Sequence, residues 1–448
     1  MRFSQRILEA MPAGGFLRAT MAIVAGTGVG QLIVILTSPV LTRLYTPSDY
    51  GIYSAATSIL ILVSVTCLRY EFAIPLPEDD VAAANLLGLS LLVNLAMCAL
   101  TAVLLTLFGP WLLSLFGASA LGPYLLLLVL AQFAGGVVSV FTNWAIRTKA
   151  FSEIGLNRLA QSVGLVLTQV GLGIAKLGAP GLVIGAVAGA VAGSERLVRA
   201  AWRTHAAAFR QISGAGMLTA AKRYRRFPIF SSWSALLGAL GLRAPLLVLI
   251  ACYGTTVGGQ YALAERIMYL PLTLVAGAVG QVFIADSARL ARGQPAELRR
   301  LFRQTTWALA RIAIGPAILI AVATPVLVGP IFGESWRDAG IFVAVLVPLF
   351  YAAFVLTSTG DILYVVERQG LQLVREFLRL GLLGGSVLLA AALHLSAFGA
   401  VVVLSAAGCV MYIAYGLISW LALARFDPES VKQPEAVALA TELSDVEL

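Results

Sequence analysis

Two arginines lie deep inside apolar stretches of this sequence, where a charged side chain is costly. Arg243 precedes Cys252 by nine residues, and Arg266 follows Val257 by nine residues. Both stretches are long enough to cross a bilayer, and their short connection predicts an antiparallel hairpin with both guanidinium groups at about the same depth. A charge near the bilayer centre costs about 3 kcal/mol or more, so it normally pairs or faces a hydrated cavity. We therefore expect a buried polar site here.

Glu265 lies beside Arg266 and could partner a buried cation. It shares one helix face with Tyr261 and Tyr269, because the three residues are spaced at intervals of four. Neighbouring residues point about 100° apart on a helix, so Arg243 can pair with Glu265 while a cation remains available. The pattern fits either a structural salt bridge between helices or a cationic cavity for a phosphate or pyrophosphate, to which the guanidinium fork offers paired donors.

Two more charged residues fall within predicted membrane spans. Arg311 lies eight residues into the stretch 303–328, where it could add to the same positive field. Its long stem could instead carry the charge to the cytoplasmic surface, and we prefer that interpretation. Asp361 is the only acid well inside the stretch 338–365, which makes it the best candidate for a proton or sodium site. A polar kink beside Gly360 explains the same residue equally well.

Charged residues near the ends of the spans are candidates for gating. Arg69 and Glu71 lie at the inner end of the second span and can form an inner gate or anchor the helix at the interface. Arg43 and Asp49 flank an outer loop and can pair across it. The four cysteines are scattered singly, and no GxxxxGK[ST] motif is present. We therefore predict no metal site, no cofactor and no catalytic residue.

Composition identifies the class of protein. Hydrophobic residues make up 59% of the 448 residues, charged residues only 12%, and the mean hydropathy is +0.91. These values lie far outside the range of soluble domains and predict an all-α polytopic membrane protein. The net charge of +9 does not point to nucleic acid, because most basic residues fall on one side of the spans.

About twelve transmembrane helices are expected. Their predicted ranges are 16–42, 51–73, 84–109, 121–146, 156–177, 179–200, 228–252, 259–284, 303–328, 338–365, 371–394 and 398–423. The N-terminus, the even-numbered connections and the C-terminal tail hold most of the 31 Lys and Arg residues, a set in which we count Arg375 and Arg379. By the positive-inside rule this side is cytoplasmic, which places both termini in the cytoplasm.

The predicted spans divide six and six around a basic cytoplasmic connection. The expected parts are an N-terminal lobe at 1–200, the connection at 201–227, a C-terminal lobe at 228–424 and a disordered acidic tail at 425–448. A sparse internal repeat supports two lobes in parallel orientation. Residues 44–56 align with residues 252–264 at a constant offset of 208, and Gly51 and Gly259 are among the identical positions.

Several segments carry a family resemblance. The first half contains Leu-Thr-Arg-Leu-Tyr-Thr-Pro-Ser-Asp-Tyr-Gly-Ile-Tyr at 41–53 and Arg-Tyr-Glu-Phe-Ala-Ile at 69–74, and the second half adds 227–228, 259–271 and 281–283. These segments resemble the O-antigen type of polysaccharide-export flippase in the multidrug/oligosaccharidyl-lipid/polysaccharide (MOP) superfamily. The resemblance implies a MATE-like, two-lobed, V-shaped transporter. It would flip undecaprenyl-pyrophosphate-linked oligosaccharide across the bacterial inner membrane for lipopolysaccharide O-antigen or exopolysaccharide.

The same resemblance implies the partners. They would be the polyprenyl-pyrophosphate-linked oligosaccharide, membrane lipids, and the polysaccharide polymerase and glycosyltransferases of the same pathway, with no nucleic acid and no enzymatic step. One rival is a multidrug or cation extruder, which would need a cavity dominated by acids. The other is an integral-membrane glycan polymerase or ligase, which should have a large outer loop, whereas the predicted outer loops are short.

Overall fold

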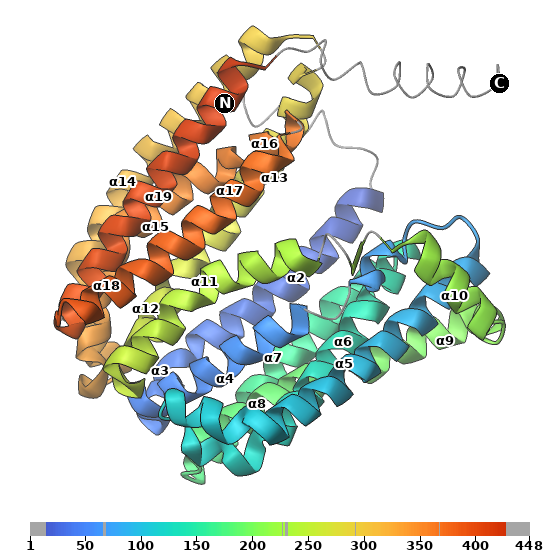
Figure 1. Cartoon of the computed structure of the whole chain (residues 1–448), viewed down its shortest axis with the longest axis horizontal. Helices are drawn as coiled ribbons and strands as arrows, with labels where there is room; N and C mark the ends of the chain where they lie inside the picture. The colour runs from blue at the N-terminus through green and yellow to red at the C-terminus, as the bar shows by residue number, and fades with distance from the viewer. Residues whose placement is uncertain are drawn as a thin grey trace. The chain divides into compact units, whose positions relative to one another are not determined.

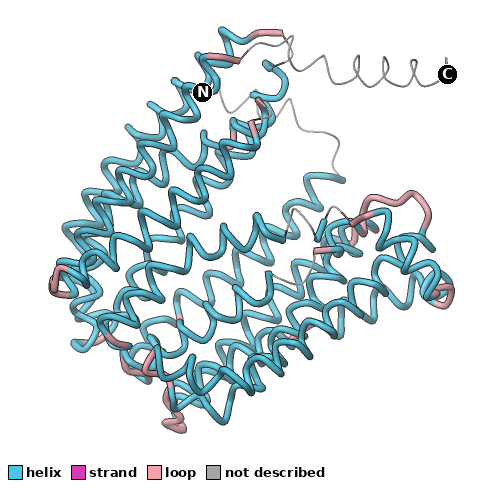
Figure 2. The backbone as a smooth tube through the Cα atoms, viewed as in Figure 1, coloured by secondary structure: helices cyan, strands magenta, loops and turns pink. Residues whose placement is uncertain are grey.

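The computed structural model describes most of the chain. The described residues are 15–65, 69–225, 227–228, 232–291, 293–366 and 368–426. All regular structure within them is helical (Figure 2), so the predicted class, an all-α polytopic membrane protein, is confirmed. From Asp427 onward, the predicted acidic tail lies outside the described residues.

Each of the predicted spans coincides with a helix or with consecutive helices. In the described part of the chain, eight helical stretches are long and apolar enough to cross a membrane. They are Gly26–Leu44, Asp80–Leu115, Leu121–Arg147, Ala179–Phe209, Ala235–Tyr253, Pro295–Phe332, Glu334–Val365 and Ala397–Ala424. At the remaining predicted positions the helices are shorter, more polar or interrupted, which lowers the hydropathy of any continuous stretch.

The chain divides into two compact units, and the first comprises Met1–Ala239 with Tyr253–Gly259. Its helices are α2 (Gly15–Leu36), α3 (Ser38–Leu44), α4 (Pro47–Val65), η1 (Tyr70–Ala73), α5 (Asp80–Leu115), η2 (Ser119–Tyr124), α6 (Leu125–Arg147), α7 (Phe151–Ile174), α8 (Ala179–Val191), α9 (Ser194–Phe209) and α10 (Gly214–Arg223). α2 packs on α7, α7 on α8, and α5 on α6 (Figure 1). A core that includes Leu86, Trp144 and Phe209 fixes α5 and α6 against α9.

The second unit comprises Leu240–Cys252 with Gln260–Leu448. It contains most of α11 (Ser232–Tyr253) and α12 (Thr255–Pro271), whose remaining residues belong to the first unit. Its other helices are η4 (Leu272–Ala276), α13 (Gly277–Ala291), α14 (Pro295–Phe332), η5 (Glu334–Trp336), α15 (Arg337–Gly360), α16 (Ile362–Val365), α17 (Gln369–Arg379), η6 (Leu380–Gly384), α18 (Gly385–Ala392) and α19 (Ala397–Ala424). α15 packs against both α14 and α19 (Figure 1). α15 is therefore the central helix of this unit.

Three helix breaks in the second unit lie next to polar residues. α12 ends at Pro271 and leads into the π-helical segment η4, and α17 ends at Arg379 and leads into the π-helical segment η6. α15 ends at Gly360, and Asp361 separates it from α16. The predicted kink beside Gly360 is therefore present. Breaks of this kind often accompany functional sites, because they turn side chains away from the regular helical spiral.

The two segments related by the internal repeat contact one another within the first unit. The Oγ of Ser48 lies 2.7 Å from the Oγ1 of Thr255. A Cβ at Gly51 would lie 1.9 Å from the carbonyl O of Thr255, and a Cβ at Gly259 would lie 1.7 Å from the carbonyl O of Pro47. Pro47 and Thr255 differ by the same 208 positions as Gly51 and Gly259, so the contact is reciprocal. Only glycine permits two helix starts to cross so closely.

Candidate functional site

The ion pair expected between the seventh and eighth spans is present. Arg243 on α11 and Glu265 on α12 approach to 3.8 Å between Nη1 and Oε2, with side chains 27% and 13% exposed. Arg266 follows Glu265 on α12 and is half-buried. A charge pair enclosed in this way is screened far less than one at a surface, so its partners constrain each other strongly.

Two tyrosines lie near this ion pair. Tyr261, one turn before Glu265, is only 5% exposed and lies within electrostatic range of Glu265, Arg243 and Tyr269. Tyr269 packs edge-on against Phe350 of α15, with ring centroids 6.3 Å apart. The intervals of four residues therefore place both phenols on the same face as the carboxylate. Buried tyrosine hydroxyls of this kind are hydrogen-bond groups available to a ligand.

A second charged group on α17 was not predicted as part of the site. Arg375 donates to the carboxylate of Glu376 at 3.0 Å, and Arg379 donates to the other carboxylate oxygen. The guanidinium of Arg375 also lies 4.5 Å from the ring centroid of Tyr415 on α19, and it donates to the Tyr415 hydroxyl. Glu376 thus bridges two arginines, and a tyrosine holds one of them.

The two charged groups lie against one another. A Cβ at Gly241, two residues before Arg243, would lie 3.0 Å from Nε of Arg379, so the last residue of α17 lies against α11. Tyr269 lies within electrostatic range of both Arg243 and Arg379. We refer to the combined set as the C-terminal polar cluster; its members are Arg243, Tyr261, Glu265, Tyr269, Arg375, Glu376, Arg379, Tyr412 and Tyr415.

Arg375 and Arg379, which we counted with the cytoplasmic basic residues, belong to the same polar cluster as Arg243. We had assigned Arg375 and Arg379 to a connection between spans and Arg243 to the interior of a span. The structure brings all three residues into one cluster. The available signal was their position inside the predicted span 371–394, together with Glu376 between them. The count concerns position along the chain and carries no information on which helices pack together.

The charges of the cluster nearly balance. Each arginine has an acidic neighbour, since Glu265 pairs with Arg243 and Glu376 pairs with Arg375 and Arg379. Buried cations require such partners when no ligand is bound. An anion that enters the cluster can replace a carboxylate as the acceptor of guanidinium hydrogen bonds. The arrangement therefore offers guanidinium donors of the kind that a phosphate-like group accepts.

Two predicted residues of the second unit lie apart from the cluster or at its edge. Arg311 is exposed on α14 and makes no ion pair with any residue that the structure describes. That exposure agrees with the preferred interpretation, in which its charge reaches towards a membrane surface. Asp361 lies within electrostatic range of Arg375, at the break after α15. Its role in ion coupling stays a prediction.

The candidate gating residues lie in the first unit. Arg69 and Glu71 line a cavity of about 300 Å³, and the guanidinium of Arg69 lies 4.8 Å from the ring centroid of Phe72. Arg43 is exposed in the last turn of α3. Asp49 accepts hydrogen bonds from the backbone and the hydroxyl of Thr46 and, through Oδ1, from the backbone of Ala179 at 2.8 Å. Asp49 therefore joins the start of α4 to the start of α8.

Comparison with known proteins places the chain in a family. Residues 40–340 match the family model described as "Polysaccharide biosynthesis protein". The chain belongs to this family. No curated protein matches the sequence. The resemblance to polysaccharide exporters is thus confirmed for most of the chain.

Solved structures similar to this polysaccharide biosynthesis protein are transporters and flippases. The lipid II flippase MurJ in an inward closed conformation has a TM-score of 0.65 at 12% identity, covering 95% of this chain and 93% of its own. A mutant of the Vibrio cholerae MATE transporter VcmN has a TM-score of 0.62 at 15% identity, covering 92% and 97%. A MOP superfamily transporter from Pyrococcus furiosus, with a binding pocket of reverse polarity, has a TM-score of 0.53 at 12% identity, covering 91% and 96%. The predicted MATE-like fold is confirmed.

Proposed function

We propose that this chain is a flippase that moves undecaprenyl-pyrophosphate-linked oligosaccharide units across the bacterial inner membrane for surface polysaccharide biosynthesis. The family membership and the likeness to a lipid II flippase support this class of cargo. The observation that carries the proposal is the C-terminal polar cluster, which gathers three arginines among apolar helices. A pyrophosphate is the part of such a cargo that needs cations inside a membrane.

Arg243 and Arg379 would bind the pyrophosphate, with Arg266, Tyr261 and Tyr269 as further contacts. Glu265 would release Arg243 when the anion arrives and pair with it again when the anion leaves. This exchange avoids an uncompensated buried cation at every stage. It also keeps the affinity moderate, because the cargo must displace a carboxylate before it binds.

Transport would proceed by alternating access, with the pyrophosphate and sugar head passing through a cationic cavity and the polyprenyl tail remaining in lipid. The protein would act as a transporter with no chemical step. Its termini would lie in the cytoplasm, and the polymerase and glycosyltransferases of the same pathway would supply and consume the lipid-linked unit.

Deletion of the gene, followed by complementation, tests this function. We expect the deletion strain to lose surface polysaccharide and to accumulate the lipid-linked unit in the inner leaflet. Normal polysaccharide with altered drug tolerance would instead establish a cation or drug extruder. Accumulation of flipped but unpolymerised units would establish a polymerase or ligase.

Variants of the cluster test the site. Arg243→Ala and Arg379→Ala should abolish complementation at normal protein levels, because each removes a cation that the cargo needs. Arg311→Ala is the matched control, since it removes an exposed arginine outside the cluster and should complement fully. Full complementation by both cluster variants would exclude the assignment of pyrophosphate binding to these residues.

A further inference from the structure

The first unit contains a cavity of about 300 Å³, lined by polar and apolar residues and separate from the C-terminal polar cluster. Residues of α4, η1, α5 and α6 line it, and the polar ones are Arg69, Glu71, Ser90, Asn94, Gln132 and Ser139. Ligand pockets in proteins span about 300 to 1,000 Å³, so this cavity has room for one small ring-sized group. The helices α5 and α6 are mostly apolar, so six polar side chains gathered at one cavity need an explanation beyond helix packing.

The charges in this cavity balance. Arg69 and Glu71 are its two charged lining residues, and each lies within electrostatic range of the other. An anion would be repelled by the carboxylate, and a cation by the guanidinium. The chemistry therefore favours a neutral ligand, in contrast to the C-terminal polar cluster, where three arginines share two carboxylates.

The remaining polar groups favour a ligand rich in hydroxyls. Asn94 and Gln132 are 3% and 2% exposed, and both line the cavity. A primary amide both donates and accepts hydrogen bonds, as a hydroxyl does, so amides match hydroxyls in either role. Glu71 adds acceptors, Arg69 adds donors, and the ring of Phe72 supplies an apolar surface for the C–H face of a sugar ring.

The lining is held in place before any ligand arrives. Nδ2 of Asn94 donates to the backbone O of Phe133 at 3.1 Å, which leaves the orientation of its amide fixed. A Cβ at Gly136 would lie 2.1 Å from Oδ1 of Asn94, so α6 presses directly on this side chain. A rigid amide loses little conformational entropy on binding, which is how a small polar pocket gains specificity.

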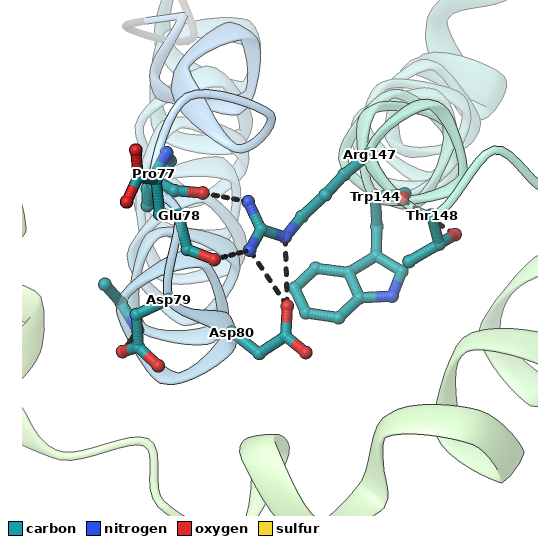
Figure 3. Close-up of polar contacts among 8 residues, drawn as sticks. Pro77, Glu78, Asp79, Asp80, Trp144, Arg147 and Thr148 are labelled. Atoms are coloured by element: carbon teal, nitrogen blue, oxygen red, sulfur yellow. Dashed lines mark hydrogen bonds and ion pairs between the residues drawn. The ribbon is translucent and has the colours of Figure 1, made fainter.

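Arg147 holds the chain segment that connects η1, which contributes to the cavity wall, to α5. Figure 3 shows its side chain reaching from α6 to the segment between η1 and α5. It binds the carboxylate of Asp80 at 2.9 Å and donates to the backbone O of Glu78 at 2.9 Å and to that of Pro77. This segment connects η1 to α5, so Arg147 helps to hold the connection against α6.

We propose that this cavity is a saccharide subsite that binds one neutral sugar residue. The proposal rests on the proposed function, in which that sugar belongs to the lipid-linked oligosaccharide while the C-terminal polar cluster binds the pyrophosphate. The two units then recognise different parts of one cargo. Sugar selectivity would reside in the first unit and recognition of the lipid carrier in the second.

Saturation-transfer NMR on the purified full chain in lipid nanodiscs tests the subsite. The probes are free D-glucose, D-galactose, N-acetyl-D-glucosamine and L-rhamnose, none of which carries phosphate or lipid. We expect at least one of them to bind, without competition from inorganic pyrophosphate. Absence of binding by all four to the wild-type chain would overturn the subsite.

Substitutions in the lining show where the sugar binds. Asn94→Leu and Gln132→Leu should each weaken binding at least about tenfold, because each leaves a sugar hydroxyl without its partner. Glu71→Gln keeps the shape and should weaken binding less. Thr101→Val is the matched control, since Thr101 is a buried polar residue of α5 outside the cavity and should leave sugar binding unchanged. Equal binding by the wild type and both leucine variants would refute the assignment.

The outcome is independent of the test of flipping. If deletion of the gene leaves polysaccharide intact, the flippase proposal fails while the sugar titrations still decide whether the cavity binds saccharide. If complementation succeeds but the Asn94→Leu and Gln132→Leu variants bind sugar as the wild type does, only the subsite proposal fails. Melting curves identify a leucine variant that does not fold. In that case the Glu71→Gln variant decides: weaker sugar binding supports the subsite, and unchanged binding refutes it.

Discussion

At the scale of single residues, the proposed function depends on how buried arginines are neutralised. Glu376 accepts from both Arg375 and Arg379, and its side chain is only 11% exposed. Removing one partner of a buried ion pair is far more damaging than breaking a surface pair, because the remaining charge stays in a poorly polarisable environment. Glu376 is therefore expected to matter for stability as well as for binding.

Glu376→Gln should lower the free energy of unfolding by about 3 kcal/mol, because two guanidinium groups lose their shared counter-charge. Glu297→Gln is the matched control: Glu297 pairs with Arg300 at 3.8 Å, and both side chains are exposed. That change should cost less than about 1 kcal/mol. Thermal melting of the detergent-purified variants compares the two. Equal shifts would mean that the Glu376 pairs are solvated.

The sequence predicted the Arg243–Glu265 ion pair but could not predict its neighbours. The number of residues between Arg243 and the short loop indicates how deep its side chain lies in the membrane. Glu265 lies at about the same depth on the next helix, so the sequence also indicates the ionic partner. The contact between Arg379 and Gly241 depends on which helices pack side by side, and no local pattern contains that information. Asn94 and Gln132 were missed for a related reason, since isolated amides inside a span look like ordinary helix contacts.

At the scale of elements, the reciprocal glycine contact ties the starts of α4 and α12 together. Gly51 faces the backbone carbonyl of Thr255, and Gly259 faces that of Pro47. Pro47 and Thr255 are equivalent residues of the internal repeat. The offset of 208 was visible in the sequence, whereas the packing of the two copies on each other was not. The same contrast holds for the two π-helical breaks. Pro271 predicts the break at η4 from the sequence, whereas no residue of comparable specificity predicts the break at η6.

Gly51→Ala should destabilise the protein by about 1 to 3 kcal/mol, because the added methyl overlaps the Thr255 carbonyl and forces the helix starts apart. Gly171→Ala is a control on α7 with open space around it, and it should be neutral or stabilising by up to about 1 kcal/mol. Melting temperatures and complementation report the difference. A Gly51→Ala variant as stable as Gly171→Ala would show that the close approach is absent in the membrane.

At the scale of the whole molecule, the helical pattern and the distribution of basic residues together predict a topology. The helix positions follow from apolar length, and the structure reproduces them. The orientation in the membrane is predicted from the excess of Lys and Arg on one side. This excess acts when the chain inserts into the membrane, so the packing of the helices does not reveal the orientation. It therefore needs a measurement in cells.

Single cysteines in a background with Cys67, Cys98, Cys252 and Cys409 replaced by serine provide that measurement. Ser119→Cys in the first unit and Ser335→Cys in the second lie at positions predicted to be outside, and both serines are exposed. A membrane-impermeant maleimide should label both in intact cells. Lys222→Cys and Arg289→Cys, also exposed and one in each unit, should react only after permeabilisation. The reverse pattern would invert the topology, and disagreement between the two units would exclude the parallel arrangement of the repeats on which alternating access depends.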